Sequence, residues 1–350
     1  MGGSDSGSVN AYQLGNSTQR LRKHPQMASN AIYVEAINQA IIEEMERDEN
    51  VFIMGEDIRR SVYGATAGLL AQFGENRVLD TPLSENGFFG AAIGASLVGM
   101  RPIVETLTSF MWVAMDQLVS QAAKMRYMFG GQATLPVVYR ATMFYGGGSA
   151  AHHSDRSYPM FMNMPGFKIL VPATPRDAKG LLKTAIRDND PCIVFEDGTL
   201  GGSSGEVEEG DAALVPFGVA DVPRSGTDVT VVAIAGAVPM ALRAAEELED
   251  EGISVEVIDP RTLVPLDKDT ILESVAKTGR LVLADPAHKV CSAASEIASI
   301  VSQEGFWDLQ APIMKVAAEQ VHIPYTPVLE RLVYPSSEKI VDAARATLED

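Results

Sequence analysis

Apolar residues in the first half of the chain alternate between helical spacing and short continuous runs. Between Ala31 and Met45 they recur three and four positions apart, which predicts a helix over Asn30–Asp48. Val51–Gly55 is a short apolar run of the kind that forms a buried strand. The same reasoning predicts strands at Pro102–Leu107, Leu135–Ala141, Phe167–Pro172 and Pro191–Glu196, and helices at Phe110–Phe129 and Pro175–Ile186.

The alternation starts again in the second half, after a stretch rich in Gly, Ser, Glu and Asp. It predicts strands at Val229–Ile234, Ile253–Ile258, Leu281–Ala284 and Ile313–Ala318, and helices at Val238–Glu251, Asp267–Ala276, Ser292–Gln303 and Ser337–Thr347. Strands that alternate with helices form mostly parallel sheets covered on both faces. We therefore expect an α/β fold of two doubly wound domains, residues 30–197 and 228–350, with a linker at 198–227 and a disordered tail at 1–29.

The stretch Asp80–Gly94 places one carboxylate, Glu85, before a run of small and apolar residues. Glycines recur within this run, and each costs a helix roughly 0.8–1.0 kcal/mol relative to alanine. Their presence suggests that another backbone approaches this helix closely, and that Glu85 lies in a dry place that tunes a carboxylate. The alternative is a glycine-tolerant core helix with a stabilising acid near its positive end.

Composition narrows the class of protein. Hydrophobic residues make up 46% and charged residues 21% of the 350-residue chain, as in globular domains, and the apolar runs are too short or too glycine-rich to span a bilayer. A net charge of −18 argues against nucleic-acid and anionic-membrane surfaces. Two cysteines far apart, Cys192 and Cys291, fit a reducing compartment. The polar N-terminal residues have no signal-peptide core.

Candidate chemistry is sparse. His152 and His153 lie in a glycine-containing loop, Thr142–Tyr158, and a histidine there could carry protons near neutral pH. Because adjacent side chains point in different directions, we expect at most one of the two to face a given site. No metal-ligand spacing, nucleotide-binding glycine motif or nucleophile elbow is present. Either the ligand is not a nucleotide, or another subunit holds its phosphates.

From about Asn30 onward the chain resembles the β subunit of the thiamine-diphosphate-dependent 2-oxoacid dehydrogenase E1 component, including its pyruvate and acetoin dehydrogenase members. Short motifs in a characteristic order carry the resemblance. They are Gly55-Glu56-Asp57, Asp80-Thr-Pro-Leu-Ser-Glu85, Met115-Asp116-Gln117, Ala122-Ala-Lys-Met-Arg-Tyr-Met-Phe-Gly-Gly131, His153-Ser154, Asp177-Ala-Lys-Gly-Leu-Leu182, Ala185-Ile-Arg-Asp188 and Asp259-Pro-Arg-Thr-Leu-Val-Pro-Leu266.

The resemblance implies a pyrimidine-binding domain followed by a transketolase C-terminal-like domain. A separate α subunit would hold Mg²⁺ and the diphosphate in an α₂β₂ heterotetramer. Glu85 would hydrogen-bond the N1′ atom of the cofactor's aminopyrimidine and favour the imino tautomer that takes the C2 proton. Phe110 would pack on the ring, and Glu56 and Leu83 would contact the cofactor. His153 would orient substrate or move protons. A monovalent-cation site for K⁺ would comprise Val137, Ala185, Ile186, Asp188 and Asp190.

Thr106–Trp112 is one residue shorter than the family's pattern, and Thr142-Met-Phe-Tyr145 is bulkier. Two segments depart further from the pattern. His152 stands where the family usually has Gln, and Asp155-Arg156-Ser157-Tyr158-Pro159 replaces a Gln-Ser-Leu-Glu or Gln-Ser-Pro-Glu sequence. In the second half, Pro286-Ala-His-Lys-Val-Cys-Ser292 replaces a glycine-rich segment.

The resemblance implies an enzyme active only with its α subunit, which decarboxylates a 2-oxoacid such as pyruvate, or cleaves acetoin, and passes the acyl group to a lipoyl-bearing E2 protein. The altered segments leave open a carboligase or acyl transferase of a specialised pathway. A non-catalytic scaffold subunit is a further alternative, against which the intact Glu85 argues. A bacterial cytoplasmic location is expected rather than the mitochondrial matrix.

Overall fold

The apolar runs of the first half become one twisted sheet in a computed structural model that describes residues 28–144 and 147–349. Seven strands lie in the order β12-β6-β7-β5-β4-β2-β3, and all neighbours pair in parallel except β12 with β6. The strands are β2 Val51–Gly55, β3 Val78–Asp80, β4 Arg101–Leu107, β5 Val138–Met143, β6 Lys168–Leu170, β7 Cys192–Asp197 and β12 Thr262–Val264.

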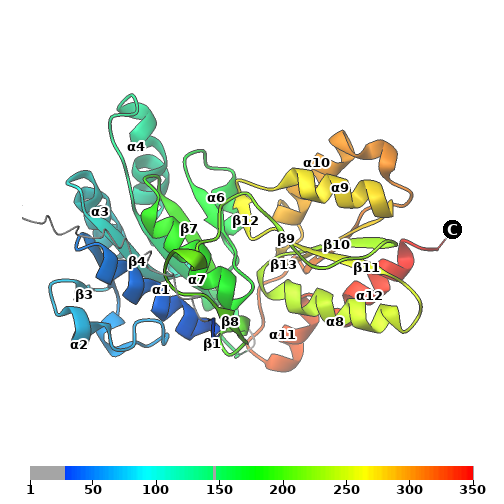
Figure 1. Cartoon of the computed structure of the whole chain (residues 1–350), viewed down its shortest axis with the longest axis horizontal. Coiled ribbons are helices and arrows are strands. Elements are labelled where there is room, and N and C mark those ends of the chain that lie inside the picture. The colour runs from blue at the N-terminus through cyan, green and yellow to red at the C-terminus, as the bar shows by residue number, and fades with distance from the viewer. Residues whose placement is uncertain (1–27, 145–146, 350) are drawn as a thin grey trace, which may run out of the picture.

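Helices cover both faces of this sheet (Figure 1). The helices α1 (Tyr33–Arg47) and α7 (Pro175–Arg187) pack on one face, and α3 (Glu85–Leu97) packs on the other. Thr174 caps α7, since its hydroxyl accepts a hydrogen bond from the Asp177 amide at 3.1 Å. Shorter helices occupy the connections: α2 Leu69–Phe73, α4 Ala123–Met128, α5 Ala150–His153 and α6 Tyr158–Met162.

The second half forms a five-stranded sheet in the order β14-β13-β10-β11-β9, parallel except for the edge strand β9. Its elements are β9 Asp221–Arg224, β10 Val229–Ala233, α8 Val238–Glu249, β11 Val255–Asp259, α9 Lys268–Thr278, β13 Leu281–His288, α10 Ala293–Glu304, β14 Met314–Ala318, α11 Pro327–Val333 and α12 Ser337–Ala346. Two doubly wound domains are thus confirmed.

Within the described ranges, no helix of either domain combines the length and apolar character needed to cross a bilayer.

Pairing between distant segments corrects two local predictions and adds a strand that local patterns did not predict. Strand β1 (Ser29–Ile32) precedes α1, which begins at Tyr33 rather than Asn30, and β1 pairs antiparallel with β8 (Ser204–Val207). The segment predicted as a linker therefore contains β8 and β9. The chain also returns from the second domain to add β12 to the first sheet. Such pairings leave no periodic signal in either segment. The predicted tail lies outside the described residues up to position 27, and the domain boundaries stay a prediction.

The segment predicted as one helix over Phe110–Phe129 is divided into three conformations. A 3₁₀ stretch at Thr108–Ala114 leads into a π-helical stretch at Asp116–Ala122, and only then does α4 begin. Short 3₁₀ and π stretches recur near functional sites. The change of winding here places residues that follow β4 beside the carboxyl edge of the sheet.

One glycine is required by its surroundings. A Cβ atom on Gly166 would lie 2.0 Å from the Ala123 carbonyl oxygen, and the residue has a φ of +113°. Gly166→Ala should therefore lower the free energy of unfolding by about 2 kcal/mol or more. Urea denaturation of the full chain measures this change. Gly94→Ala is the control, because a Cβ there meets no atom of the described residues within 4 Å and alanine favours the helix. Equal effects at both glycines would contradict the prediction.

Candidate active site

Four of the predicted site residues follow neighbouring parallel strands. Glu56 comes directly after β2, Glu85 begins α3 after β3, Phe110 lies in the 3₁₀ stretch after β4, and His153 ends α5 after β5. The carboxyl ends of parallel strands lie at one edge, where open α/β sheets bind ligands. The fold therefore brings together residues that are up to 97 positions apart in sequence, which is the separation between Glu56 and His153.

The two glutamates are electrostatically coupled. Burial, and after it the neighbouring carboxylates of Glu85 and Asp57, together raise the pKa of Glu56 to about 7. The Oε1 atom of Glu56 is buried and receives no hydrogen bond from any described residue. Sequence reasoning expected the tuned acid to be Glu85, yet Glu85 is only half-buried within this chain. The Glu56 carboxyl of this chain thus has a pKa close to neutral pH.

The rings of His152 and His153 gather around Phe110. The centroid of its ring lies 5.6 Å from that of His153 and 5.7 Å from that of His152, and the two imidazoles are 5.0 Å apart. Both imidazoles thus lie next to one aromatic ring, and which of the two faces a substrate stays a prediction. The short helix α5 turns the chain sharply enough to bring adjacent side chains to one ring. Nearby, the Trp112 indole donates to Asp155 Oδ2 at 2.9 Å.

The site shows unsatisfied polar groups that fit a polar ligand. The hydroxyls of Thr81, Ser109 and Ser154 follow β3, β4 and β5, are buried, and form no hydrogen bond with described residues. Together with Glu56 Oε1 they line the same edge of the sheet. A buried polar atom without a partner costs free energy unless a ligand or another chain satisfies it. A ring with nitrogen donors and acceptors, such as an aminopyrimidine, has the chemistry to do so.

Leu83 lies in the turn that leads into α3, and 84% of its side chain is exposed. The glycine face of α3 is open as well, because Cβ atoms on Gly87 and Gly90 would meet only the side chains of Ser84 and Gln117. The predicted close approach of another backbone therefore does not occur within the described chain. These surfaces would become buried only against a ligand or a second polypeptide.

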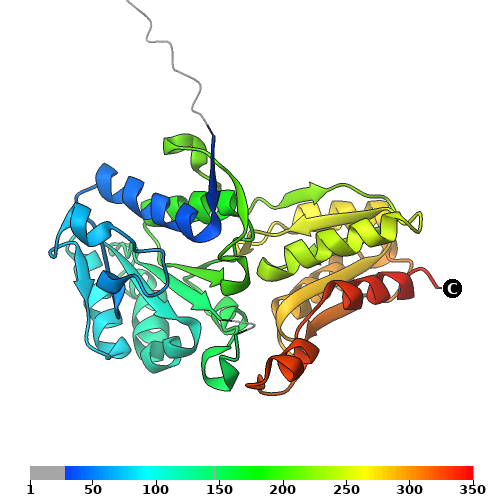
Figure 2. The same cartoon turned by 90° about the horizontal axis from the view of Figure 1, so that it is seen from below.

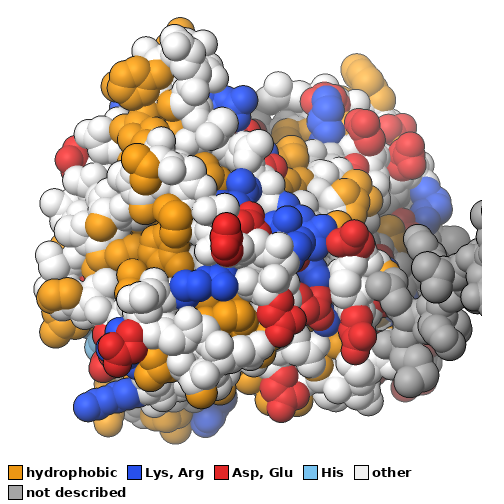
Figure 3. All heavy atoms as spheres, turned by 60° about the vertical axis from the view of Figure 1, so that its left-hand side comes forward, with side chains coloured by type: hydrophobic (Ala, Val, Ile, Leu, Met, Phe, Trp, Pro, Cys, Tyr) orange, Lys and Arg blue, Asp and Glu red, His pale blue; other side chains and the backbone are white. Residues whose placement is uncertain are grey.

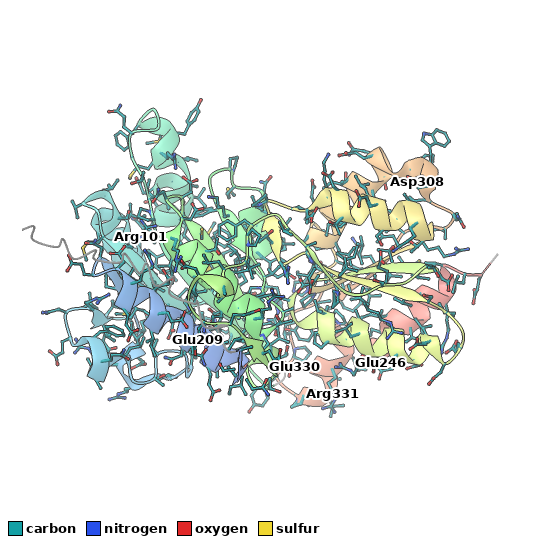
Figure 4. The ribbon with its side chains drawn as sticks, in the orientation of Figure 1. Arg101, Glu209, Glu246, Asp308, Glu330 and Arg331 are labelled. Atoms are coloured by element: carbon teal, nitrogen blue, oxygen red, sulfur yellow. The ribbon has the colours of Figure 1, made fainter. Side chains whose placement is uncertain are left out.

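The residues predicted to hold a monovalent cation lie in a cluster of ion pairs. The Arg101 guanidinium donates to the Ile186 carbonyl at 2.8 Å and to the Asp188 carbonyl (Figure 4). The Lys168 ammonium lies 2.6 Å from Asp188 and 3.2 Å from Asp190. The protein's own cations thus already satisfy several of the predicted ligand atoms. The role of Val137, Ala185, Ile186, Asp188 and Asp190 as a cation site stays a prediction, and the described residues hold no cluster of three metal-binding side chains.

A buried ion network beside the site was not foreseen. The Arg140 guanidinium donates to both oxygens of Glu196 at 2.7 Å and also to Glu105, and all three side chains are buried. A cavity of about 410 Å³ lies over this network and is bounded by Tyr33, Tyr63 and Phe144. Burial raises the pKa of Tyr63, which lines this cavity, and the carboxylates of Glu105 and Glu56 raise it further.

The raised pKa of Glu56 predicts a pH effect on stability. An ordinary glutamate has a pKa of 4.5, so between about pH 4.5 and 7 the folded chain binds more protons than the unfolded chain. The free energy of unfolding should therefore fall as pH rises through this window. Glu56→Gln should remove that loss, so the variant should gain in melting temperature over the wild type between pH 5 and pH 8. Thermal melts of the full chain at both pH values test this.

The control for that experiment is Glu75→Gln, because the Glu75 side chain is 78% exposed. Its melting temperature relative to the wild type should not change with pH. A pH-independent difference for Glu56→Gln would contradict the assignment of the raised pKa to this residue.

Comparison with known protein families supports the two-domain architecture. The transketolase pyrimidine-binding domain family matches residues 30–201, and the transketolase C-terminal domain family matches residues 218–340. A solved structure described as a split-gene transketolase, an inactive β₄ tetramer, superposes with a TM-score of 0.76 at 25% identity. It covers 91% of this chain and 99% of that one.

Characterised relatives match over nearly the whole described chain. The β subunit of acetoin:2,6-dichlorophenolindophenol oxidoreductase from Cupriavidus necator is 48% identical, over 90% of this chain and 96% of that protein. The 2-oxoisovalerate dehydrogenase β subunit of Bacillus subtilis is 46% identical, over 91% of this chain and 98% of that protein. The pyruvate dehydrogenase E1 β subunit of Rhizobium meliloti is 44% identical, over 89% of this chain and 68% of that protein. The substrates named for these three relatives differ, although their similarity to this chain is nearly equal.

Proposed function

Because this chain belongs to the family of transketolase-like E1 β subunits, we propose that it forms the pyrimidine-binding part of a thiamine-diphosphate site. The assembled enzyme would decarboxylate a 2-oxoacid such as pyruvate, or cleave acetoin, and pass the acyl group to a lipoyl-bearing E2 protein. One observation carries the proposal. Glu85 begins α3 within electrostatic reach of a second carboxyl, Glu56, which has a pKa of about 7 and an unpartnered buried oxygen.

Each residue of the site has a role that its position supports. Thiamine diphosphate, when bound, supplies the electron sink for cleaving the bond next to a carbonyl. Glu85 would hold a proton at the pyrimidine nitrogen, and its carboxylate helps to raise the pKa of the neighbouring Glu56. Phe110 would pack against the ring, and Leu83 would contact the cofactor from the turn. His153, next to Phe110, would orient the substrate or move a proton during acyl transfer.

An α-type subunit would complete the site. The chain has no glycine-rich phosphate-binding motif, so we infer that the partner holds the diphosphate with Mg²⁺. The open glycine face of α3 and the exposed Leu83 fit burial by that partner. Figure 3, which brings the side of α3 and α4 forward, shows hydrophobic side chains gathered over part of this face. At the C-terminal ends of α3 and α4, the exposed hydrophobic residues are Leu97, Val98, Tyr127, Met128 and Phe129. Such patches mark interaction surfaces.

Further details follow the same proposal. An α₂β₂ heterotetramer would present the acidic surface of this chain, which has a net charge of −18, to a basic domain of E2. A bacterial cytoplasmic location fits the free thiols of Cys192 and Cys291. K⁺ would bind at the Val137–Asp190 cluster only if it displaced or shared the contacts of Lys168 and Arg101.

Co-expression with an α-type subunit tests the proposal. The purified complex is assayed with thiamine diphosphate, Mg²⁺, a panel of 2-oxoacids and acetoin, with an artificial electron acceptor and lipoamide in parallel. Turnover with both acceptors supports an E1 enzyme and names its substrate. A complex that binds no thiamine diphosphate would overturn the proposal and favour a scaffold subunit.

A carboligase is the second candidate, because the segment after His153 differs from the family's pattern and contacts the site through Trp112 and Asp155. Product analysis separates the two functions. Acyl-lipoamide is expected from an E1 enzyme, whereas an α-hydroxyketone formed from two carbonyl substrates would show a carboligase.

A further inference from the structure

The two segments that depart from the family's pattern contact each other. Tyr158 belongs to the altered segment after His153, and its hydroxyl donates to Asp285 Oδ1 within β13. The amide of Ala287, in the other altered segment, donates to the Tyr158 hydroxyl at 3.1 Å. The amides of Ala287 and Ala294 also donate to Asp285, each at 2.9 Å. Tyr158 and Asp285 are both buried, so this contact fixes the start of α6 to the C-terminal domain.

Arg156 forms a second connection two residues earlier. Its Nη1 atom donates to the carbonyl oxygens of Phe144 at 2.7 Å and Ser154 at 3.1 Å. Its guanidinium lies 5.2 Å from the ring centroid of Tyr334, which connects α11 to α12 in the C-terminal domain. The Tyr334 hydroxyl donates to the same Ser154 carbonyl at 3.3 Å. The carbonyl that follows His153 is therefore held by a residue from each domain.

These contacts lie at the base of the segment that carries the histidines. Phe144 directly follows β5, and Ser154 directly follows His153. Arg156 therefore bonds one carbonyl before the two histidines in the sequence and one after them. Figure 2 shows α11 next to this segment. Glu330 of α11 lies where the two domains meet, and its Oε2 atom accepts a hydrogen bond from the Gly148 amide at 3.5 Å (Figure 4).

We propose that Arg156 and Tyr334 are positioning residues that set the placement of His153 against the substrate, through the Ser154 carbonyl. This inference rests on the proposed function, because it assigns His153 a part in turnover. Hydrogen bonds from a charged donor are about twice as strong as neutral ones, and the planar guanidinium can bond several carbonyls while stacking on a ring. Lysine offers one compact charge and cannot do both.

The test uses the assembled complex and the substrate that the wild type turns over. Arg156→Lys and Arg156→Met should each lower kcat by about 10- to 100-fold with little change in KM, because small misplacements of a catalytic group cost up to about 10² in rate. Tyr334→Phe keeps the ring and loses one hydrogen bond, so a several-fold loss is expected. Melting temperature and cofactor affinity are measured for every variant, and Arg345→Met, which removes an exposed arginine of α12, is the control.

A double-mutant cycle separates positioning from general destabilisation. If Arg156 acts through His153, then adding Arg156→Met to His153→Ala should cause no further loss of kcat. Additive losses would overturn the inference, and so would wild-type kcat in both Arg156 variants. A fall in activity that only follows the melting temperature would overturn it as well. A wild-type complex that is inactive with every substrate and binds no cofactor would instead overturn the proposed function, and this inference with it.

Discussion

Glu85→Gln is expected to lower kcat of the assembled enzyme by about 10³-fold, within the range of a general acid–base group. Glutamine keeps the shape and one hydrogen bond of the side chain but cannot exchange a proton with the pyrimidine nitrogen. Single-turnover rates with saturating thiamine diphosphate measure the effect, and cofactor affinity is measured separately by titration. The loss should appear in kcat, because the proton is needed during turnover rather than for binding alone.

The matched control is Glu75→Gln, which removes an exposed carboxylate from the same domain. Wild-type turnover in Glu85→Gln would refute the role assigned to this residue. Equal losses in both variants would point to a global electrostatic effect. A lost pH dependence of turnover in Glu56→Gln, with cofactor still bound, would support a proton shared between Glu56 and Glu85.

Arg140→Met should destabilise the chain by about 3–5 kcal/mol, the largest effect on folding that we predict. Among the described residues, Arg140 is the cation that pairs with two buried carboxylates, Glu105 and Glu196, and the substitution removes it. Burial raises the pKa of Glu105, the Glu196 carboxylate adds to the rise, and the Arg140 guanidinium opposes it. Without the guanidinium, both carboxyls must be buried unpaired or take up protons. Urea denaturation of the full chain gives the change in free energy of unfolding.

A compensated variant makes this prediction sharper. Neutralising the partners as well, with Glu105→Gln and Glu196→Gln added to Arg140→Met, should restore part of the lost stability, because the cost arises from unpaired charge. Arg345→Met breaks an exposed pair with Glu251 and should change stability by less than about 1 kcal/mol. Similar small effects in Arg140→Met and Arg345→Met would refute the importance of the buried network.

Local patterns were a good guide where one element decides its own conformation. Thr174 and Pro175 marked the start of α7, and the apolar runs marked most strands, because capping and side-chain period act over a few residues. The same patterns gave no sign of β1, β8 or β12, whose strand pairing depends on partners far along the chain. The segment after β4 looked helical from its period, yet it mixes three kinds of helix because packing against α3 overrides local preference.

For the candidate site, too, the sequence indicated some features and only the structure showed the others. The family resemblance carried by short motifs pointed to Glu85, Glu56, Phe110 and His153, and the structure places them after neighbouring parallel strands. The sequence alone gave no sign of the raised pKa of Glu56, since desolvation depends on what surrounds this carboxyl in space. It also missed the contact of both histidines with Phe110, and the connection of Arg156 and Tyr158 to the second domain.

The sequence by itself determined the fold class and the family, because these follow from local periodicity and from motif order. Only the tertiary structure decided which groups share a charge environment and which segments hold one another in place. Coulombic coupling, burial and hydrogen bonding act through distances in space, and Arg140, Glu105 and Glu196 come together from three separate strands. The folded chain alone sets those distances.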